Sequence, residues 1–535
     1  MSDFFFRTED LDLSEISEFF VETAQDRDVI DQLKKRNPTV LVGSRGVGKS
    51  FLLRVAQSEM LRDFNSTREF PVYLSFMKGS LLHAKDSNIF RAWMLGRLSI
   101  AILKALQKAG LIASIPAASS ILAGGAVSTA IERTKIEDFI ESTENAWRTG
   151  ESVDPALVPD VEQFRDALES LSEELQIRRL HLLIDEAAHI LMPAQQREFF
   201  SLFRDLRSSY VTCNAAVYPG VTSFGDSFQP SHDATMLSID RSIQDPQYLS
   251  NMREIVEKQA DSTLKTAIIK NQNNFEALAY ASTGNPRLLL KTVATASKLR
   301  SADVAAVFRD FYRTDIWRDH TDLSEKYSGH SEIVEWGRKF VEDTVLPDIK
   351  AKNDSYTDAS KNTSAFFWVN KKASERVKNA LRILCYTGVI QELETGIKAT
   401  RSEIGTRYLV NLGILFAKEG TPSVSKALEV ARNLTPRRMT EYTPAHVVLA
   451  DFDKIQIVDP EEDMFSLKDR MAQSSAKLDL TDWQKSKLQE LGLTTVREVY
   501  TAPLSTFQKA HYVGKVRAAQ MRNAAEAAVL EYLSG

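Results

Sequence analysis

The feature that most constrains this chain is the segment Gly43–Ser44–Arg45–Gly46–Val47–Gly48–Lys49–Ser50, which matches G-x-x-x-x-G-K-[ST] at every fixed position. Residues 38–42 before it are typical of a short buried strand, and residues 51–56 continue it as an apolar-faced helix. This context of strand, glycine-rich loop and helix start is the one that the motif requires. Glycines let successive N–H groups curl around a phosphate, and the helix N-terminus adds a positive dipole end. The segment predicts a nucleotide-binding α/β domain with a parallel sheet.

The loop also predicts individual roles. Lys49 would neutralise the β- and γ-phosphates of ATP, and the Ser50 hydroxyl would be a ligand of Mg²⁺. The predicted nucleotide contacts are Gly43, Ser44, Arg45, Gly46, Val47, Gly48, Lys49, Ser50 and Phe51.

A second landmark is Leu180–His181–Leu182–Leu183–Ile184–Asp185–Glu186, an apolar run that ends in two carboxylates. Such a run is typical of a buried parallel strand whose C-terminal end faces the phosphates. Asp185 would orient Mg²⁺, directly or through water, and Glu186 would polarise the attacking water. We therefore expect an Mg²⁺-dependent ATPase.

Two later segments could sense the γ-phosphate. Residues 214–222 predict a strand that ends in a turn, with Asn214, Tyr218 and Thr222 as equal candidates. In Thr283–Gly284–Asn285–Pro286–Arg287, Gly284 ends one helix and Pro286 begins the next. Arg287 then lies in a first helical turn, from which it can reach back toward the phosphate.

Composition limits the class of protein. About 150 residues per domain suggests three or four domains in 535 residues, and a net charge of −5 leaves only a local basic face for nucleic acid. Cys213 and Cys385 lie in apolar surroundings and predict buried thiols of a reducing compartment. The N-terminal residues lack the pattern of a signal peptide, so a cytoplasmic location is expected.

Residues 111–130 carry no charge over roughly the length of a membrane span. Pro116, the Gly124–Gly125 pair and several serines argue against a membrane helix. We expect a small-residue insertion or a partner-contacting hairpin there, and an exposed acidic helical region over residues 132–162.

Together these motifs resemble the AAA+ ATPases, in particular the origin-recognition-complex branch and its bacterial relatives, over about residues 15–315. The resemblance implies a nucleotide domain with a helical lid, in which Arg287 matches the sensor arginine. The arginine that acts on a neighbouring subunit is expected within residues 224–234, where this chain has none. Arg204, Arg207 or Arg241 could replace it, so oligomerisation stays open.

Relatives often carry a winged helix after the lid, and residues 375–386 predict an amphipathic helix that Gly388 closes. Residues 389–393 and 397–400 then predict the strands of a hairpin. Phosphate contacts would come from Lys371, Lys372, Arg376 and Lys378, and from Lys398, Arg401 and Arg407 on the wing. The alternative is a solvated basic face on a domain that docks against protein.

The C-terminal segments 488–496 and 507–525 each predict a helix, a glycine turn and a second helix, and resemble helix-hairpin-helix domains. Such hairpins hold a DNA phosphate without reading bases. Lys509, Lys515, Arg517 and Arg522 gather at the second unit, so residues 477–535 predict sequence-independent binding of duplex DNA. A helical protein-docking module is the alternative.

The predicted organisation is a P-loop nucleotide-binding domain followed by mainly helical domains. The expected boundaries are 1–245 for the nucleotide domain, 246–315 for the lid, 316–440 for the winged-helix-like domain, 441–476 for a linker and 477–535 for the helix-hairpin-helix domain. Zinc spacings and serine- or cysteine-based triads are absent, and Asp348–Ile349–Lys350 lacks the upstream acid of a nuclease site.

These features predict an ATP-driven switch that engages duplex DNA, a partner effector protein or both, without a membrane anchor. The resemblance makes a role in bacterial anti-phage or mobile-element biology plausible. One alternative is a STAND-like signalling scaffold with slow ATP turnover and a protein-binding C-terminal half. Another is a replication-initiator or clamp-loader-like factor.

Overall fold

The computed structural model describes most of the chain. The described residues are 4–525 apart from 7, 9, 10, 77–86, 116, 126–133, 150–153, 188–192, 221, 223, 226, 327–330, 356–361, 400, 401, 453–470, 479, 516, 519 and 523.

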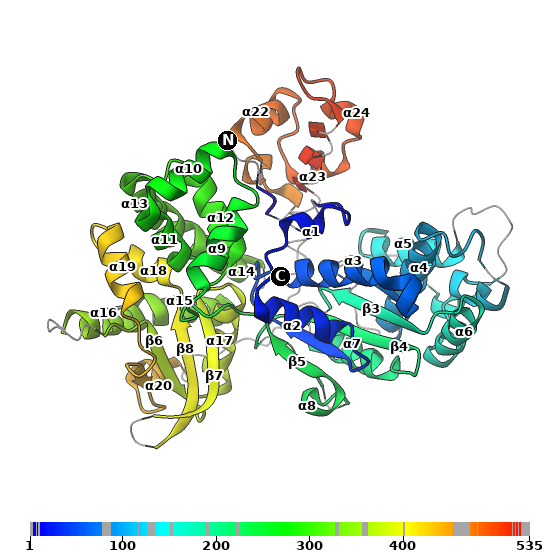
Figure 1. The fold of residues 1–535 in the computed structure, drawn as a ribbon, viewed down its shortest axis with the longest axis horizontal. Coiled ribbons are helices and arrows are strands. Elements are labelled where there is room, and N and C mark those ends of the chain that lie inside the picture. The colour runs from blue at the N-terminus through cyan, green and yellow to red at the C-terminus, as the bar shows by residue number, and fades with distance from the viewer. Residues whose placement is uncertain are drawn as a thin grey trace.

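The first sheet is parallel and lies in the N-terminal half (Figure 1). Its strands are β1 (Thr39–Val42), β2 (Glu69–Ser75), β3 (Arg179–Asp185), β4 (Val211–Val217) and β5 (Thr235–Ser238). They lie in the order β2-β3-β4-β1-β5. Every residue of β3 and β4 is buried, as expected for strands covered on both faces. The α/β fold class with a parallel sheet is confirmed, and β4 lies between the two strands that carry the predicted chemistry.

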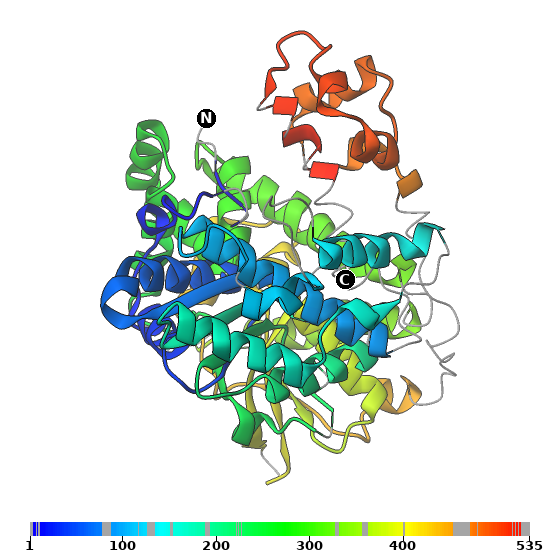
Figure 2. The same ribbon diagram turned by 90° about the vertical axis from the view of Figure 1, so that its right-hand side faces the viewer.

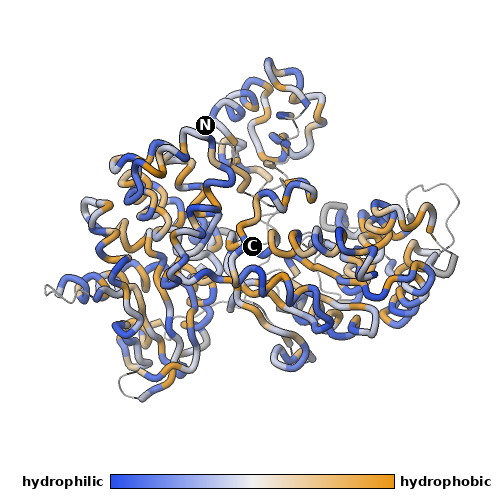
Figure 3. Tube along the Cα trace, in the orientation of Figure 1, coloured by the Kyte–Doolittle hydropathy of each residue, from blue (hydrophilic) through white to orange (hydrophobic). Residues whose placement is uncertain are grey.

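Helices pack around this sheet. They are α1 (Ile16–Phe19), α2 (Ala24–Leu33), α3 (Lys49–Thr67), α4 (Ser87–Lys108), α5 (Lys135–Thr149), α6 (Val161–Glu174), α7 (Pro193–Asp205) and α8 (Pro230–Asp233). The strands of the sheet are mainly hydrophobic, whereas the helices alternate between hydrophobic and hydrophilic segments (Figure 3). This alternation is typical of helices that turn one side toward a core.

The small-residue stretch and the acidic region differ from the expectation. Residues Ala117–Ala123 form a 3₁₀ helix in which Ser119 and Leu122 are fully buried, because small side chains allow close packing against α4 and α6. Residues 116 and 126–130 of the stretch lie outside the described part. Helix α5 is amphipathic, and its Ile136 and Phe139 are buried, so the acidic region is not wholly exposed.

A helical lid follows the first sheet. It comprises α9 (Tyr248–Glu257), α10 (Ser262–Lys270), α11 (Gln272–Ala281), α12 (Pro286–Thr295) and α13 (Ser301–Asp310). A π-helical turn, Phe311–Asp315, joins α13 to the next helix.

The second sheet lies beyond the lid. Its strands are β6 (Phe366–Asn370), β7 (Ile390–Lys398), β8 (Ile404–Val410) and β9 (Thr440–Tyr442), in the order β7-β8-β6-β9. The accompanying helices are α14 (Ile316–Lys326), α15 (Ser331–Lys339), α16 (Leu346–Asp354), α17 (Glu375–Tyr386), α18 (Leu412–Ala417), α19 (Val424–Arg432) and α20 (Val447–Phe452). We call residues 316–452 the second-sheet domain. Lid and second-sheet domain contribute to one continuous apolar core.

The hairpin is built differently from the prediction. Residues 390–398 form the single strand β7, which pairs with β8, and Gly396 adopts a φ of 76° at an irregularity of this pairing. A glycine at a bulge has the same sequence signal as a glycine at a turn. Between β6 and β7 the chain forms one helix, α17, where a helix-turn-helix would have two.

Part of the expected linker also belongs to the second-sheet domain. Strand β9 pairs in parallel with β6. Phe452 of α20 is fully buried and stacks on Trp336 with 4.1 Å between the ring centroids. Residues 453–470 lie outside the described part of the chain.

The C-terminal unit has its own apolar core, which extends from Met471 to Ala525. Figures 1 and 2 both place it at one end of the molecule, away from the two sheets. It contains α22 (Asp482–Glu490), α23 (Val496–Thr501) and α24 (Leu504–Phe507). Gly492, with a φ of 72°, forms the turn after α22, and Thr495 caps α23, as predicted.

Within the described part of the chain, no helix combines the length and the apolarity that crossing a membrane would need. Both cysteines are buried free thiols, and burial raises the pKa of Cys213 to about 12.

Candidate nucleotide site

The phosphate loop joins β1 directly to α3, and Lys49 is the first residue of that helix. The Lys49 ammonium donates to the carbonyl oxygen of Gly43 at 2.6 Å and to that of Ser44 at 3.1 Å. The side chain is only 7% exposed, and burial lowers its pKa to about 8, although Glu186, Asp185 and Asp240 favour the charged form. A phosphate bound to the loop would favour the charged form of Lys49 and so offset the effect of burial on its pKa.

The loop is open where a phosphate would lie. Gly48 has a φ of 107°, and a Cβ added to it would meet no atom within 4 Å. The backbone therefore curls around unfilled space at the N-terminus of α3, which is suited to an anion. Ser50 lies in the first turn of the same helix. Phe51 packs against Phe20, with 6.3 Å between the ring centroids.

The two carboxylates lie at the C-terminal end of β3. Asp185 accepts a hydrogen bond from the Tyr73 hydroxyl at 2.8 Å and one from the Glu186 N–H at 3.0 Å. Glu186 has a φ of 45°, in the left-handed region that non-glycine residues rarely adopt. Burial and the Asp185 charge raise the pKa of Glu186. A half-buried carboxyl with a strained backbone and a raised pKa is typical of a functional site.

Of the three sensor candidates, Tyr218 lies at the site. Its hydroxyl donates to Glu186 Oε1 at 2.6 Å, and the Lys49 ammonium lies 4.0 Å from its ring centroid. Tyr218 directly follows β4, so the position of β4 between β1 and β3 places it between lysine and carboxylate. The strand begins three residues earlier than predicted, at Val211, and ends at Val217, so Asn214 lies inside the strand and Thr222 lies beyond its end.

Asn214 lies inside the sheet instead. Its amide bonds the backbone of Thr39 and of Leu33, at 2.9 and 3.0 Å, so it holds α2 and the start of β1. The Thr222 hydroxyl donates to the Tyr218 carbonyl at 2.9 Å and supports the turn. Neither side chain is directed at the phosphate loop.

The lid turn contacts the phosphate loop directly. Asn285 caps α12 and its amide donates to the Arg45 carbonyl at 2.7 Å. The Arg287 N–H donates to the Gly46 carbonyl at 3.4 Å, and the Arg287 guanidinium donates to the Phe6 carbonyl at 3.0 Å. The structure thus brings the backbone of Arg287 to the loop, and the contact of its guanidinium with a γ-phosphate stays a prediction. The sequence did not predict the contact between Asn285 and Arg45, because a helix-capping asparagine indicates only the start of its own helix.

Arg241, considered as a replacement for the arginine that acts on a neighbouring subunit, is engaged within its own chain. It donates to the Val47 carbonyl at 2.7 Å and to both carboxylate oxygens of Asp26 at 3.1 Å, all within its own chain. Arg204 and Arg207 are exposed at the end of α7 and after it. Arg204 also donates to the Ser227 carbonyl at 2.7 Å.

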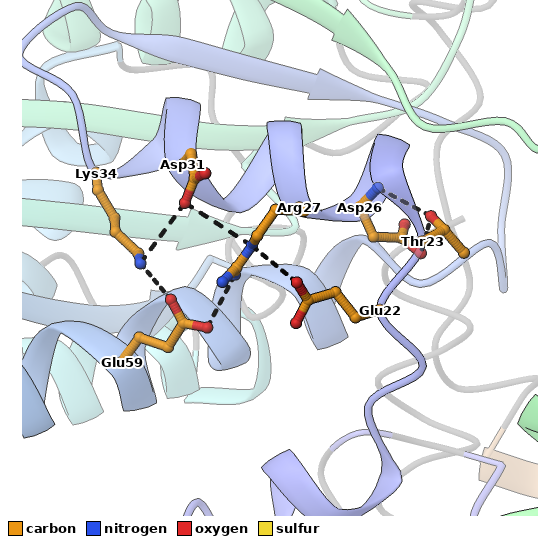
Figure 4. A network of polar contacts seen from close by, with 7 residues as sticks. All are labelled: Glu22, Thr23, Asp26, Arg27, Asp31, Lys34 and Glu59. Carbon is orange, nitrogen blue, oxygen red and sulfur yellow. Dashed lines mark hydrogen bonds and ion pairs between the residues drawn. The ribbon is translucent and has the colours of Figure 1, made fainter.

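A polar network holds α2 on α3 (Figure 4). Glu59 of α3 accepts from Arg27 of α2 at 2.8 Å and also pairs with Lys34, the residue after α2. These two cations outweigh burial and lower the pKa of this carboxylate. Thr23 caps α2 by accepting from the Asp26 N–H at 3.0 Å. The network fixes the helix that covers one side of the phosphate-loop helix.

The predicted magnesium ligands are Ser50 and Asp185. Among the described residues, no group of three or more His, Cys, Asp and Glu side chains could hold a metal ion. Hydroxyl and carboxylate oxygens suit Mg²⁺, which commonly takes one or two protein ligands and completes its shell with phosphates and water. The donor set therefore fits Mg²⁺ bound together with a nucleotide.

The N-terminal part of this chain is similar to ORC-CDC6-like proteins. The family model of that description matches residues 4–78, which contain β1, the phosphate loop, α3 and β2. The match covers too little of the chain to assign the whole protein to the family. No curated protein matches the chain.

Three solved structures resemble the chain weakly. A Walker-type ATPase of Pyrococcus abyssi is 14% identical, with 79% of this chain and 97% of that chain covered and a TM-score of 0.39. The Aeropyrum pernix ORC1 protein in complex with DNA is 12% identical (75% and 93% covered, TM-score 0.32). The ORC2 protein of the same organism is 9% identical (79% and 92% covered, TM-score 0.33).

The predicted DNA contacts lie on two separate surfaces. Lys371, Lys372 and Lys398 are exposed, whereas Arg407 pairs with Glu394 at 3.0 Å and Arg401 lies outside the described residues. Arg376 and Lys378 are half-buried on α17. In the C-terminal unit, Lys509, Lys515 and Arg517 are exposed and Arg522 is half-buried.

The D-x-K segment has a structural role. The Asp348 carboxylate accepts from the Tyr442 hydroxyl at 2.8 Å, and Lys350 pairs with Glu419 at 2.8 Å. Both residues therefore hold α16 against its own domain.

Proposed function

We propose that this protein binds and hydrolyses ATP as an AAA+ switch of the ORC-CDC6-like type. The observation that carries the proposal is the position of Tyr218, which contacts the phosphate-loop lysine and the carboxylate at the end of β3. Only the strand order β3-β4-β1 brings these three residues together. The ORC-CDC6-like match over residues 4–78 supports the same class.

The chemistry assigned to the chain follows from these positions. Lys49 and the N–H groups at the start of α3 neutralise the phosphate oxygens and hold the terminal phosphate in place. Glu186 accepts a proton from, or orients, the attacking water, and its raised pKa makes it a stronger base than an exposed carboxylate. The Tyr218 hydroxyl holds Glu186 in position through the 2.6 Å hydrogen bond. Bound through Ser50 and Asp185, Mg²⁺ would supply charge neutralisation at the β- and γ-phosphates.

The lid turn couples the nucleotide state to the rest of the chain. Asn285 and Arg287 contact the backbone of Arg45 and Gly46, so a phosphate that reshapes the loop also shifts the lid. The Arg287 side chain extends beyond the backbone contact with Gly46, and its guanidinium senses the γ-phosphate. Such a two-state element converts binding into domain movement.

Duplex DNA is the partner proposed for residues 477–535. The hairpin Tyr512–Val513–Gly514 precedes a helical segment, and Lys509, Lys515 and Arg517 around it are exposed. Exposed cations beside a helix start are suited to backbone phosphates, which carry no sequence information. A partner effector protein, a cytoplasmic location and a role in anti-phage or mobile-element biology remain predictions.

The test is steady-state ATP hydrolysis of the full chain with and without duplex DNA. We expect stimulation that the double substitution Lys509→Glu and Lys515→Glu removes, because it repels phosphates at the hairpin. The matched control makes the same change of net charge at two exposed lysines of α10, with Lys265→Glu and Lys270→Glu. ATP binding without DNA stimulation in the wild type would favour the signalling scaffold. Sequence-selective duplex binding would favour the initiator-like alternative.

A further inference from the structure

We propose that Tyr386, the last residue of α17 in the second-sheet domain, is a positioning residue for ATP hydrolysis. It would act through Tyr218 on Glu186, and this inference rests on the proposed ATPase function. Helix α17 was predicted to contact DNA. Its C-terminal end instead packs on the residue that follows β4.

The contact is a chain of three side chains. The rings of Tyr386 and Tyr218 meet edge to face, with 4.9 Å between centroids and 89° between planes. Edge-to-face pairs of this separation are favourable beyond their buried area. The Tyr218 hydroxyl reaches Glu186 Oε1 at 2.6 Å, and Lys49 lies over the Tyr218 ring at 4.0 Å. Tyr386 therefore restricts the ring that orients the proposed base.

Both tyrosines are buried in the core shared by lid and second-sheet domain. Tyr386 is 1% exposed and Tyr218 is 5% exposed. Burial raises the pKa of Tyr218 well above its ordinary value, so the hydroxyl keeps its proton and remains a donor to Glu186. Although Tyr218 follows a strand of the first sheet, it packs with the core of the other domains.

Further contacts hold the second-sheet domain at the same place. Gly220, two residues after Tyr218, lies against Arg382 of α17, and a Cβ at Gly220 would come within 2.8 Å of the arginine Cγ. Gln391 of β7 bonds the Asp240 carboxylate, which also accepts from the backbone of Ser44 in the phosphate loop.

The lid joins this interface from its other side. The Leu412 N–H at the start of α18 donates to the Thr283 hydroxyl at 2.8 Å, next to the lid turn. Elements α17, β7 and α18 thus each contact a segment that borders the proposed active site. Separation of the second-sheet domain would release the Tyr218 ring, so hydrolysis would report on whether that domain is docked.

The test compares Tyr386→Leu with Tyr386→Phe in the full-length chain. Loss of the ring should lower kcat for ATP hydrolysis roughly tenfold, while the Kd for ATP stays within about twofold, because Tyr386 acts on the proposed base through Tyr218. Tyr386→Phe keeps the ring pair and should retain most of kcat. The matched control is Tyr312→Leu, which removes an equally buried tyrosine of the same core. An equal fall of kcat in the control would overturn the proposal.

A double-mutant cycle distinguishes positioning from general loosening. Tyr218→Phe removes the hydrogen bond to Glu186, so adding Tyr386→Leu should lower kcat no further; independent, additive losses would contradict the inference. Thermal unfolding checks the fold of each variant, and Tyr386→Met serves if Tyr386→Leu unfolds. A wild type without turnover would overturn the proposed function itself. If the wild type hydrolyses ATP and the Tyr386→Leu and Tyr386→Met variants keep its full kcat, this inference alone is overturned.

Discussion

The guanidinium of Arg241 donates to the carbonyl oxygen of Val47 over 2.7 Å. Arg241 follows the last strand of the first sheet by three residues, and Val47 lies in the phosphate loop. The same guanidinium binds Asp26 of α2, and its backbone carbonyl faces Gly284 of the lid turn. One residue therefore joins three parts of the site: its side chain binds the loop and the helix that covers it, and its backbone carbonyl lies against the lid turn.

Arg241→Ala should destabilise the protein by about 3 kcal/mol, because it leaves the Asp26 carboxylate buried without its cation. The free energy of unfolding in urea measures this loss. Adding Asp26→Asn should recover part of it, since the uncompensated charge is then absent. The control Arg207→Ala removes an exposed arginine and should leave the unfolding free energy nearly unchanged.

Lys49→Ala should weaken ATP binding by about a hundredfold or more, because a charge-assisted contact to phosphate contributes about 3 kcal/mol. Fluorescence anisotropy of a labelled ATP gives the affinity. Lys35→Ala, at an exposed lysine of the same domain, should bind as the wild type does. If Lys49→Ala keeps the wild-type affinity for ATP, the phosphate loop is not the nucleotide-binding site.

Glu186→Gln should trap bound ATP with little turnover. The amide oxygen can still accept from Tyr218, but it cannot take a proton from water, so kcat should fall by about 10²- to 10⁴-fold at unchanged affinity. Single-turnover hydrolysis of radiolabelled ATP measures the step. Glu254→Gln, an exposed position on α9, is the control. Turnover at the wild-type rate would exclude Glu186 as the base.

Gly284→Ala should destabilise the docked lid by about 2 kcal/mol or more. The residue has a φ of 79°, and an added Cβ would lie 2.4 Å from the Arg241 carbonyl oxygen. Gly110→Ala is the matched control, because Gly110 has a φ of 70° but open space around an added Cβ. The difference in melting temperature between the two variants isolates the contact. Equal shifts would show that backbone strain alone is responsible.

Stability should fall as the pH decreases from about 6.5 to 4. His320 is fully buried on α14, 3.0 Å from the Thr387 hydroxyl and 3.1 Å from the Val334 carbonyl. Burial, with a smaller effect of the Arg338 charge, lowers its pKa to about 4, although the Val334 carbonyl opposes the shift. The unfolded chain, with an ordinary pKa of 6.5, then binds more protons within this interval.

Chemical unfolding at pH 7.5 and pH 5 measures this dependence. The wild type should lose about 2 kcal/mol between these values through His320. His320→Gln, which cannot titrate, should lose correspondingly less. The same loss in both proteins would assign the pH dependence to other groups.

Local chemistry explains what the sequence could predict. The spacing of the phosphate loop, the apolar run before Asp185 and the capped turn at Gly284 depend on backbone conformation within a few residues, so strand, loop and helix starts were correct. The glycine and the proline before Arg287 predict that it lies in a first helical turn, whereas its place beside the loop was expected from the phosphate-loop motif and the resemblance to AAA+ ATPases. The same logic failed at Gly396, since bulge and turn both need a positive φ.

Tertiary structure decided which of these elements meet. Asn214 and Tyr218 could not be distinguished from the sequence, because the end of β4 at Val217, which depends on pairing with distant strands, decides which of them lies at the C-terminal end of the strand. Tyr386 carried no signal at all, since an aromatic residue at the end of an amphipathic helix ordinarily indicates only a core. The sequence by itself determined the phosphate-loop motif and the two acids at the end of an apolar strand. The order β3-β4-β1 and the docking of α17 decided what surrounds them, because contacts between distant segments depend on packing that no local pattern encodes.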